Sequence, residues 1–207
     1  MRIAKEGYPV IAVPAVLTLA CAFMGWTWAA VVFAIVTFAV TAFFRDPDRK
    51  APAGEGLILA PADGRVVQIR ELEEFRAGGK TRLSIFMSPL DVHVNRSPVA
   101  GRVQEIDYQR GCFMPAYKED CSENNERNAL TLIDGNGRAV KLVQIAGIMA
   151  RRIVCRAKAG DRLEAGERFG IIMFGSRVDV YFPPGAKIIV TEGQHVTGGE
   201  TILAQVL

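Results

Sequence analysis

The first strong pattern in the chain is an uninterrupted apolar stretch near the N-terminus. From Gly7 to Phe44 the sequence contains no charged residue. One membrane-spanning helix requires about 20 residues. This stretch is longer than that and could hold two short helices. The segment 25–28, GWTW, predicts a break between them, because glycine loosens a helix and tryptophan favours a membrane–water interface.

The charges that flank this stretch predict its orientation. Cationic residues lie on both sides of it: Arg2, Lys5, Arg45, Arg49 and Lys50. Such residues favour the cytoplasmic side, so both ends are expected there. A cleaved signal peptide is disfavoured, because the apolar run is far longer than a signal core. We therefore expect residues 1–50 to form an α-helical membrane hairpin, which either crosses the bilayer or enters one leaflet; the alternative is a buried helical hairpin of a soluble protein.

After residue 50 the pattern changes to short apolar runs that are separated by glycine turns. β-branched and aromatic residues dominate these runs, which predicts strands. The predicted strands lie in the segments 56–69, 81–88, 101–108, 128–147, 170–186 and 201–207. The pairs DG and NG at 134–137 predict a turn inside one of them. Since no long amphipathic helix is predicted here, apart from a turn or two near 71–76, residues 51–207 are expected to be a mainly β domain.

One predicted strand segment contains an interruption. Residues 170–186, GIIMFGSRVDVYFPPGA, are typical of β structure, yet Gly175 and Ser176 lie in the middle. Neither residue type stabilises the interior of a strand. The pair therefore needs another explanation, either structural or chemical.

A glycine-turn unit occurs twice near the C-terminus. GDRLEAGERFGI begins at Gly160 and GQHVTGGETILA begins at Gly193, so the two units match at an offset of 33 residues. Two such halves resemble a barrel-sandwich hybrid, the lipoyl- and biotinyl-type fold, and we expect this architecture for residues 51–207. In carriers of that type a modified lysine lies between the halves. Here Gly175-Ser176 occupies the connection and Lys187 follows only after PPGA, which disfavours a carrier.

Composition and charge exclude several other functions. The net charge is +3 and no lysine and arginine cluster is interleaved with aromatic residues, so nucleic acid is not an expected partner. The chain has only two histidines, and its four cysteines form neither a C-x-x-C pair nor a disulfide pattern, so no metal site is expected. The cysteines are Cys21, Cys112, Cys121 and Cys155. We expect reduced thiols, as in the cytosol.

The Gly175-Ser176 pair suggests that the chain processes itself. A serine hydroxyl can attack the carbonyl of the preceding residue, and glycine there gives the backbone the freedom that this attack needs. The resulting ester can eliminate to dehydroalanine, which hydrolyses to a pyruvoyl group and ammonia. The products are a large chain, 1–175, and a small chain, 176–207, that begins with a ketone. A ketone forms a Schiff base with an amine and accepts electrons, so pyridoxal phosphate is not needed.

Two polar residues are candidate partners of Ser176: one lies in a polar notch between apolar runs, and the other lies at a turn that leaves a strand. His93 lies in FMSPLDVHVNRSPVAG, and an imidazole can accept the serine proton and later protonate a carbanion. Asp63 lies in APADGRV, where a carboxylate can orient and charge an imidazole. The structural alternatives are a loop-capping histidine for His93 and an ordinary turn for Asp63. The second histidine, His195, lies in a Gly-Gln-His turn and is expected to be inert.

These segments together resemble the short-form phosphatidylserine decarboxylase proenzymes, which are pyruvoyl-dependent. The matching motifs, in family order, are FFRDPDR, PADGRV, SPLDVHVNRSP, ENNERNAL, IAGIMARRIV and FGSRVDVYFP. The resemblance implies cleavage between Gly175 and Ser176, a pyruvoyl group derived from Ser176, and an Asp63–His93–Ser176 relay. Long-form relatives carry LGST at the cleavage site and a second histidine three residues after the first, where this chain has Arg96. The resemblance therefore leaves open whether His93 acts in maturation, turnover or both.

The family resemblance also implies a substrate and a location. The reaction would release CO2 from phosphatidylserine and give phosphatidylethanolamine, a step of phospholipid biosynthesis. Because the tails of this substrate stay in the bilayer, we expect the hairpin in the inner cell membrane and the catalytic domain on the cytoplasmic side. The apolar loop Cys112–Tyr117 is expected either at the headgroup entrance or at the end of a core strand. Arg151 and Arg152 are candidates for binding the phosphate or carboxylate, with plain solvent exposure as the alternative.

Two other functions are compatible with parts of the pattern. One is a pyruvoyl-dependent decarboxylase of a soluble amino acid or another headgroup, although a membrane hairpin would have no use in the soluble case. The other is a membrane adaptor without catalytic activity, which needs a long helical hairpin between its half-motifs. The offset of 33 residues leaves no room for that hairpin. The expected partners are the lipid and the two cleaved chains; a homo-oligomer is compatible with the sequence, which does not fix the oligomeric state.

Overall fold

The computed structural model describes residues 2–72, 81–114, 124–147, 152–173 and 176–206. The chain divides into two compact units, Met1–Asp48 and Arg49–Leu207. Each unit is described by itself below.

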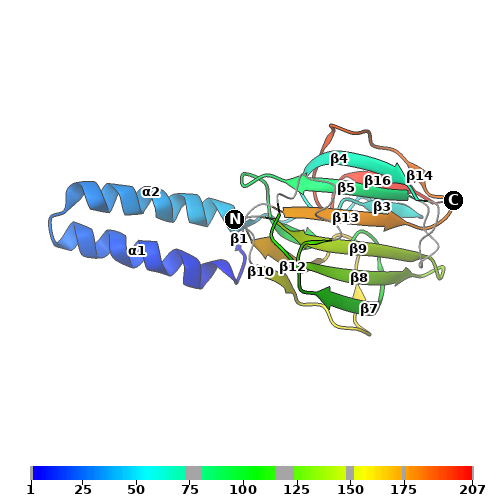
Figure 1. Ribbon diagram of the computed structural model, residues 1–207, viewed down its shortest axis with the longest axis horizontal. Helices are drawn as coiled ribbons and strands as arrows, with labels where there is room; N and C mark the ends of the chain where they lie inside the picture. The colour runs from blue at the N-terminus through cyan, green and yellow to red at the C-terminus, as the bar shows by residue number, and fades with distance from the viewer. Residues whose placement is uncertain (1, 73–80, 115–123, 148–151, 174–175, 207) are drawn as a thin grey trace. The chain divides into compact units, whose positions relative to one another are not determined.

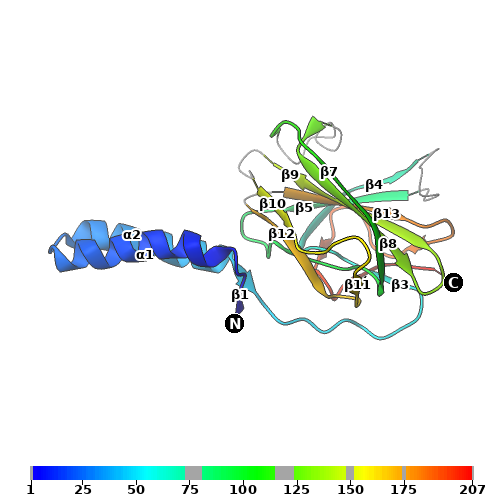
Figure 2. The same cartoon turned by 90° about the horizontal axis from the view of Figure 1, so that it is seen from below.

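The first unit is a helical hairpin. Helix α1 (Gly7–Phe23) and helix α2 (Thr27–Phe43) lie side by side, as Figures 1 and 2 show. Two short antiparallel strands, β1 (Arg2–Ile3) and β2 (Arg45–Asp46), pair at the open end of the hairpin. The break between the helices lies where the sequence predicts it, at Gly25, whose φ of +73° is a left-handed conformation that glycine adopts without strain.

The two helices contact each other through small and polar groups. The hydroxyls of Thr18 and Thr37 lie 3.4 Å apart, and each also bonds to a carbonyl of its own helix. Gly7 lies against the ring of Phe44, where a Cβ atom would be 2.5 Å from the ring carbon Cγ. Among the described residues, no helix combines the length and the apolar character that crossing a membrane requires. The helical prediction is confirmed, and the placement of the hairpin in a membrane stays a prediction.

The second unit is built around one curved antiparallel sheet (Figures 1 and 2). Its strands follow one another in the order β11 (Arg162–Leu163), β7 (Gly101–Gln109), β8 (Arg127–Asp134), β9 (Ala139–Ala146), β13 (Ser176–Phe182), β5 (Thr81–Met87), β4 (Gly64–Glu71) and β15 (His195–Val196). β13 therefore lies in the interior of the sheet, paired with β9 on one side and β5 on the other.

Two three-stranded sheets complete the unit. One contains β10 (Arg152–Cys155), β12 (Arg168–Met173) and β6 (Val94–Arg96), and the other contains β14 (Lys187–Ile188), β16 (Ile202–Gln205) and β3 (Leu57–Leu59). The prediction of a mainly β domain is confirmed, since every segment that the sequence predicts as a strand contains one or two of these strands.

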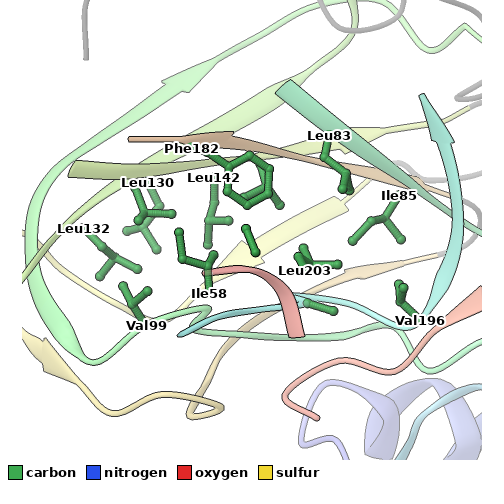
Figure 3. Packing of buried hydrophobic residues seen from close by; sticks show 14 of the residues in the cluster. Ile58, Leu83, Ile85, Val99, Leu130, Leu132, Leu142, Phe182, Val196 and Leu203 are labelled. Carbon is green, nitrogen blue, oxygen red and sulfur yellow. The ribbon is translucent and has the colours of Figure 1, made fainter. Parts of the chain in front are cut away.

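The hydrophobic core takes side chains from both the large sheet and a small one. Figure 3 shows Leu83, Leu142 and Phe182 of the eight-stranded sheet converging with Ile58 of β3 and Leu203 of β16. All five are at most 2% exposed. Burial of each such side chain contributes about 1.5–3 kcal/mol of hydrophobic free energy. The sheet that contains β3 and β16 thus stabilises the inner face of the large one.

The internal repeat has a structural counterpart. In each unit a short strand is followed by a turn and a longer strand, β11 before β12 and β15 before β16. The turns contain Gly166 and Gly199, with φ of +78° and +77°. These glycines lie against each other, because a Cβ atom on Gly199 would be 3.4 Å from the Cα atom of Gly166. Both positions have a left-handed conformation, which glycine adopts without strain.

The interrupted segment 170–186 forms two strands rather than one. β12 ends at Met173 in a three-stranded sheet, and β13 begins at Ser176 in the eight-stranded sheet. Residues 174 and 175 lie outside the described part of the chain. The Gly175-Ser176 pair thus falls where the chain passes from one sheet to another.

Candidate active site

Ser176 is the first residue of the interior strand β13. It pairs with Met87 of β5 on one side and with Ala146 of β9 on the other. Its side chain is fully buried. The pairing on both sides fixes the position of the backbone, so the sheet holds this serine in a defined place. The predicted partner Gly175 lies outside the described residues.

Ser176 lies among apolar side chains. A separate buried cluster beside it is formed by Ala62, Met87, Ala146, Ile172 and Val178. The serine hydroxyl donates to the thioether sulfur of Met87 at 3.3 Å. A thioether is a weak acceptor, and a buried hydroxyl without a strong partner costs about 1–3 kcal/mol. The serine hydroxyl is therefore poorly stabilised in this position.

His93 lies directly before β6 and is also fully buried. Its Nδ1–H donates to the backbone carbonyl of Asp91 at 2.9 Å, since a carbonyl can only accept. In the neutral ring this bond leaves the lone pair on Nε2, the form that can take up a proton. The carbonyl of His93 accepts from the backbone N–H of Ile172 at 3.3 Å, which anchors the histidine to β12.

Asp63 occupies the turn that leads into β4. One carboxylate oxygen accepts from the backbone N–H of Gly198 at 2.7 Å, and the other accepts from the guanidinium of Arg49 at 2.9 Å. Burial raises the pKa of Asp63, while the Gly198 bond and the Arg49 charge oppose that rise. Arg49 also bonds to Glu200 at 3.1 Å. The arginine at the end of the motif FFRDPDR thus binds the aspartate of the motif PADGRV.

Asp91 connects the loop before His93 to the second histidine of the chain. Its carboxylate accepts from the backbone N–H of Ser88 at 2.8 Å and from Nε2 of His195 at 3.1 Å. Burial alone would raise the pKa of Asp91, but the bonds from Ser88 and His195 outweigh it and hold that pKa below its usual value. His195, which the sequence predicts to be inert, therefore has a carboxylate partner.

The three predicted site residues border one apolar cluster. Ala62 precedes Asp63, and Ile172 bonds to the backbone of His93; both belong to the cluster beside Ser176. The hydrogen bonds described for the Asp63 carboxylate come from Arg49 and Gly198. An Asp63–His93–Ser176 relay therefore stays a prediction.

The sequence did not single out a chain of buried amides beside Ser176. It consists of Asn128 on β8, Gln144 on β9 and Asn95 on β6, linked by hydrogen bonds of 2.9 and 2.8 Å. One sequence feature could have identified these amides as buried. Gln144 lies in LVQIAG and Asn95 in VHVNRS, where apolar neighbours indicate a buried strand. A polar side chain in such a strand needs a partner, and only the fold shows which one.

Other predicted features lie at the surface or outside the described residues. Arg152 is exposed on β10. Arg151, Cys121 and residues 115–117 of the loop Cys112–Tyr117 are not described. Cys21, Cys112 and Cys155 are free thiols, and within the described ranges no group of three or more histidine, cysteine, aspartate or glutamate residues could hold a metal ion.

A cavity of about 330 Å³ lies at the far end of β13 from Ser176. Its lining includes Leu57, Asp134, Arg138 and Pro183, and Pro183 directly follows the last residue of that strand. Asp134 and Arg138 form an ion pair of 2.7 Å within this lining. The cavity therefore lies away from the chemistry suggested by Ser176, His93 and the apolar cluster.

Comparison with known proteins agrees with the motifs. The family model described as phosphatidylserine decarboxylase matches residues 36–204. Proteins named phosphatidylserine decarboxylase proenzyme from Azorhizobium caulinodans, Anaplasma phagocytophilum and Nitratidesulfovibrio vulgaris are 46%, 45% and 45% identical to this chain. The alignments cover 97%, 98% and 99% of this chain, and 87%, 90% and 95% of those proteins. The chain therefore belongs to the phosphatidylserine decarboxylase family.

Proposed function

We propose that this chain is a self-processing phosphatidylserine decarboxylase, a carboxy-lyase that converts phosphatidylserine into phosphatidylethanolamine and CO2. Cleavage between Gly175 and Ser176 gives a large chain, 1–175, and a small chain, 176–207, whose first residue is a pyruvoyl group made from Ser176. The observation that carries the proposal is the burial of Ser176 at the start of an interior strand, inside the family motif FGSRVDVYFP.

The surroundings of Ser176 fit the group that processing would make. Conversion to pyruvoyl replaces the CH2OH side chain by a methyl group. A methyl group suits the cluster of Met87, Ala146 and Val178 better than a hydroxyl that bonds only weakly to sulfur. The pyruvoyl group supplies a carbonyl that bonds covalently to the substrate amine and accepts the electron pair left by CO2.

His93 is the proposed proton carrier. The bond from its Nδ1–H to the Asp91 carbonyl favours the neutral tautomer with a basic Nε2. Nε2 can then take the serine proton during processing and return a proton to the substrate carbon after CO2 has left. Its burial excludes water, which would otherwise compete for that proton.

Asp63 is proposed to place a negatively charged carboxylate at the edge of the site. Its carboxylate is held by Arg49 and by the backbone N–H of Gly198. Gly198 belongs to the proposed small chain, while Arg49 and Asp63 belong to the large one. These bonds therefore join the two chains next to the apolar cluster.

The two glycine-turn units support the proposed barrel-sandwich hybrid architecture. Each unit places a strand of one small sheet, β12 or β16, after a tight turn, and the turns pack together at Gly166 and Gly199. The connection between the units contains Ser176. In this architecture the reactive residue therefore lies between the two halves, as the modified lysine does in a carrier domain.

The hairpin is proposed to anchor the enzyme in the inner membrane, with the catalytic domain on the cytoplasmic side. Large apolar side chains on both helices are exposed, among them Leu19, Phe23, Trp28 and Phe38 at 71–94%. Contiguous exposed apolar surface of this kind is rare on soluble proteins and suits lipid. The exposed Arg152 remains a candidate for the lipid phosphate.

Tryptophan fluorescence tests the anchor directly. Trp26 and Trp28 are the only tryptophans in the chain, so the native emission reports on the hairpin turn alone. In phosphatidylserine-containing vesicles, lipids brominated along the acyl chain should quench this emission, because the indoles enter the lipid. Trp26→Phe and Trp28→Phe assign the signal to each residue. Emission that is insensitive to brominated lipid would contradict the membrane anchor.

The mass of the C-terminal fragment tests the proposed function. Purified protein should contain a fragment that begins at residue 176, with a mass lower by one ammonia than that of the same fragment with an N-terminal serine. Phenylhydrazine should label this fragment and block the release of CO2 from phosphatidylserine in mixed micelles. An active protein that consists of a single uncut chain without a reactive carbonyl would refute the proposal.

A further inference from the structure

The buried amide chain beside Ser176 has a direction. Nδ2 of Asn128 donates to Oε1 of Gln144, and Nε2 of Gln144 donates to Oδ1 of Asn95. The three residues are at most 3% exposed. Gln144 and Asn95 thus each accept through their amide oxygen from the residue before them in this chain, so the N–H groups point in sequence from Asn128 toward Asn95. Two links fix the orientation of the last amide.

The donor end of this chain lies next to the reacting serine. Nδ2 of Asn95 contacts the sulfur of Met87 at 3.9 Å, and the hydroxyl of Ser176 contacts the same sulfur at 3.3 Å. A thioether at 3.9 Å is a weak acceptor for an amide N–H. A buried donor that lacks a strong acceptor costs about 1–3 kcal/mol. The fold therefore keeps a costly donor beside Ser176.

The sequence makes room for this arrangement. Asn128 and Gln144 are direct cross-strand partners in β8 and β9, so their side chains lie on the same face of the sheet. Asn95 pairs with Gly170 in the neighbouring small sheet. A Cβ atom on Gly170 would be 3.0 Å from Nε2 of Gln144 and 2.4 Å from the carbonyl oxygen of Val154. Glycine at position 170 thus lets the Gln144 amide reach Asn95.

We propose that Asn95 is a catalytic residue of the self-processing reaction and donates a hydrogen bond to the oxyanion formed when Ser176 attacks the carbonyl before it. In this step a bond forms from the serine oxygen to the carbonyl carbon, the serine proton goes to His93, and the carbonyl π electrons move onto oxygen. The C–N bond then breaks, nitrogen takes the proton, and an ester remains. Gln144 and Asn128 are positioning residues, and the inference rests on the proposed function.

The physical reason is that the step creates the acceptor that Asn95 lacks. The oxyanion forms on the carbonyl joined directly to the nitrogen of Ser176, and Ser176 itself is fully buried beside an apolar cluster, which makes a dry site. A fixed donor in such a site binds the developing charge strongly, because it needs no reorientation and meets no competing water. Before the attack, the partner of the same donor among the described residues is the Met87 sulfur. The interaction is therefore gained in the transition state.

The test follows processing of the full-length chain made by cell-free synthesis. Asn95→Leu keeps about the same side-chain size and removes the donor, and it should slow the appearance of the small chain by about 10²-fold. Gln144→Met removes the amide that orients Asn95 but keeps the donor, so it should slow processing by about 10-fold. The buried Ser97, whose hydroxyl bonds to the Val99 carbonyl, provides the control Ser97→Ala, which should process at the wild-type rate.

Hydroxylamine identifies the step that is affected. It cuts an ester and thereby releases the small chain with an N-terminal serine. If Asn95 assists the attack, Asn95→Leu accumulates no ester, and hydroxylamine releases no additional fragment. A purely structural role would instead slow processing only as far as the fold is destabilised, which urea denaturation of each variant in the Ser176→Ala background measures.

Two results would overturn the inference. One is processing of Asn95→Leu at the wild-type rate, and the other is accumulation of a hydroxylamine-sensitive ester in that variant. In both cases normal wild-type processing leaves the proposed function intact. Failure of the wild-type chain to form the small fragment at all would remove the proposed function and this inference together.

Discussion

Replacing Ser176 with alanine is expected to give a folded, full-length chain without decarboxylase activity. The variant lacks the oxygen that attacks the preceding carbonyl, so neither the cut nor the ketone can form. Activity should fall by about 10⁴-fold or more, the scale of loss when a covalent catalyst loses its reacting group. The fold should be retained, because an alanine methyl group fits the cluster of Met87, Ala146 and Val178. Denaturing electrophoresis, intact mass and CO2 release measure the three outcomes.

Two further variants distinguish the loss of the reacting hydroxyl in Ser176→Ala from a general disturbance of the fold. His93→Ala keeps the hydroxyl but removes the proposed base, so it should process slowly and show reduced turnover. Ser97→Ala removes another buried serine hydroxyl, and it should be cleaved and active. A normal small chain from Ser176→Ala would show that the cut lies elsewhere. Wild-type behaviour of His93→Ala in both assays would exclude that histidine from the site.

Replacing Asp179 with alanine is expected to cause the largest loss of stability. On β13, Asp179 lies on the sheet face opposite to Ser176, where Nε of Arg177 donates to its carboxylate at 2.6 Å. Arg177 also donates to the hydroxyl of Ser84 at 2.6 Å, and all three residues are at most 1% exposed. Removal of the carboxylate leaves the guanidinium charge in a dry interior, which should cost about 3–5 kcal/mol. Urea denaturation in the Ser176→Ala background measures the difference in unfolding free energy.

Two controls make this second prediction specific. Asp107 on β7 of the same sheet is exposed, and its carboxylate accepts a hydrogen bond from the neighbouring Gln109 side chain. Asp107→Ala should therefore change stability by about 0.5 kcal/mol or less. Arg177→Met combined with Asp179→Leu removes both charges and should recover most of the loss. If Asp179→Ala were as stable as Asp107→Ala, the buried ion pair would not stabilise the sheet.

Local sequence patterns predict the elements that depend on local physics. Gly25 marks the hairpin turn because the chain needs a positive φ there, and Gly166 and Gly199 mark the repeated turns for the same reason. Segment 170–186 shows where this reasoning ends. Its β-branched and aromatic residues predict β structure correctly. They do not identify the partner strand, so the change of sheet between β12 and β13 is visible only in the fold.

The candidate site likewise contains residues that the sequence predicts and residues that only the fold identifies. The motifs name Ser176, His93 and Asp63 because these residues occur together, in family order, in segments that resemble one family. Met87, however, looks like any core residue until the pairing of β5 with β13 places its sulfur on the serine hydroxyl. The role of Asn95 likewise depends on contacts with Gln144, which lies on a strand of another sheet. Such residues need tertiary contacts for their assignment.

The last 32 positions, Ser176–Leu207, contain strands that pair with strands from the rest of the molecule. They supply β13, which pairs with β5 and β9, and also β15 and β16, which pair with β4 and β3. After a cut before Ser176 the two polypeptides stay together without a covalent link. Once melted, however, they must find each other by diffusion, so recovery becomes bimolecular and depends on concentration. Heat melting of the cut protein should therefore be recovered less completely as the protein concentration falls.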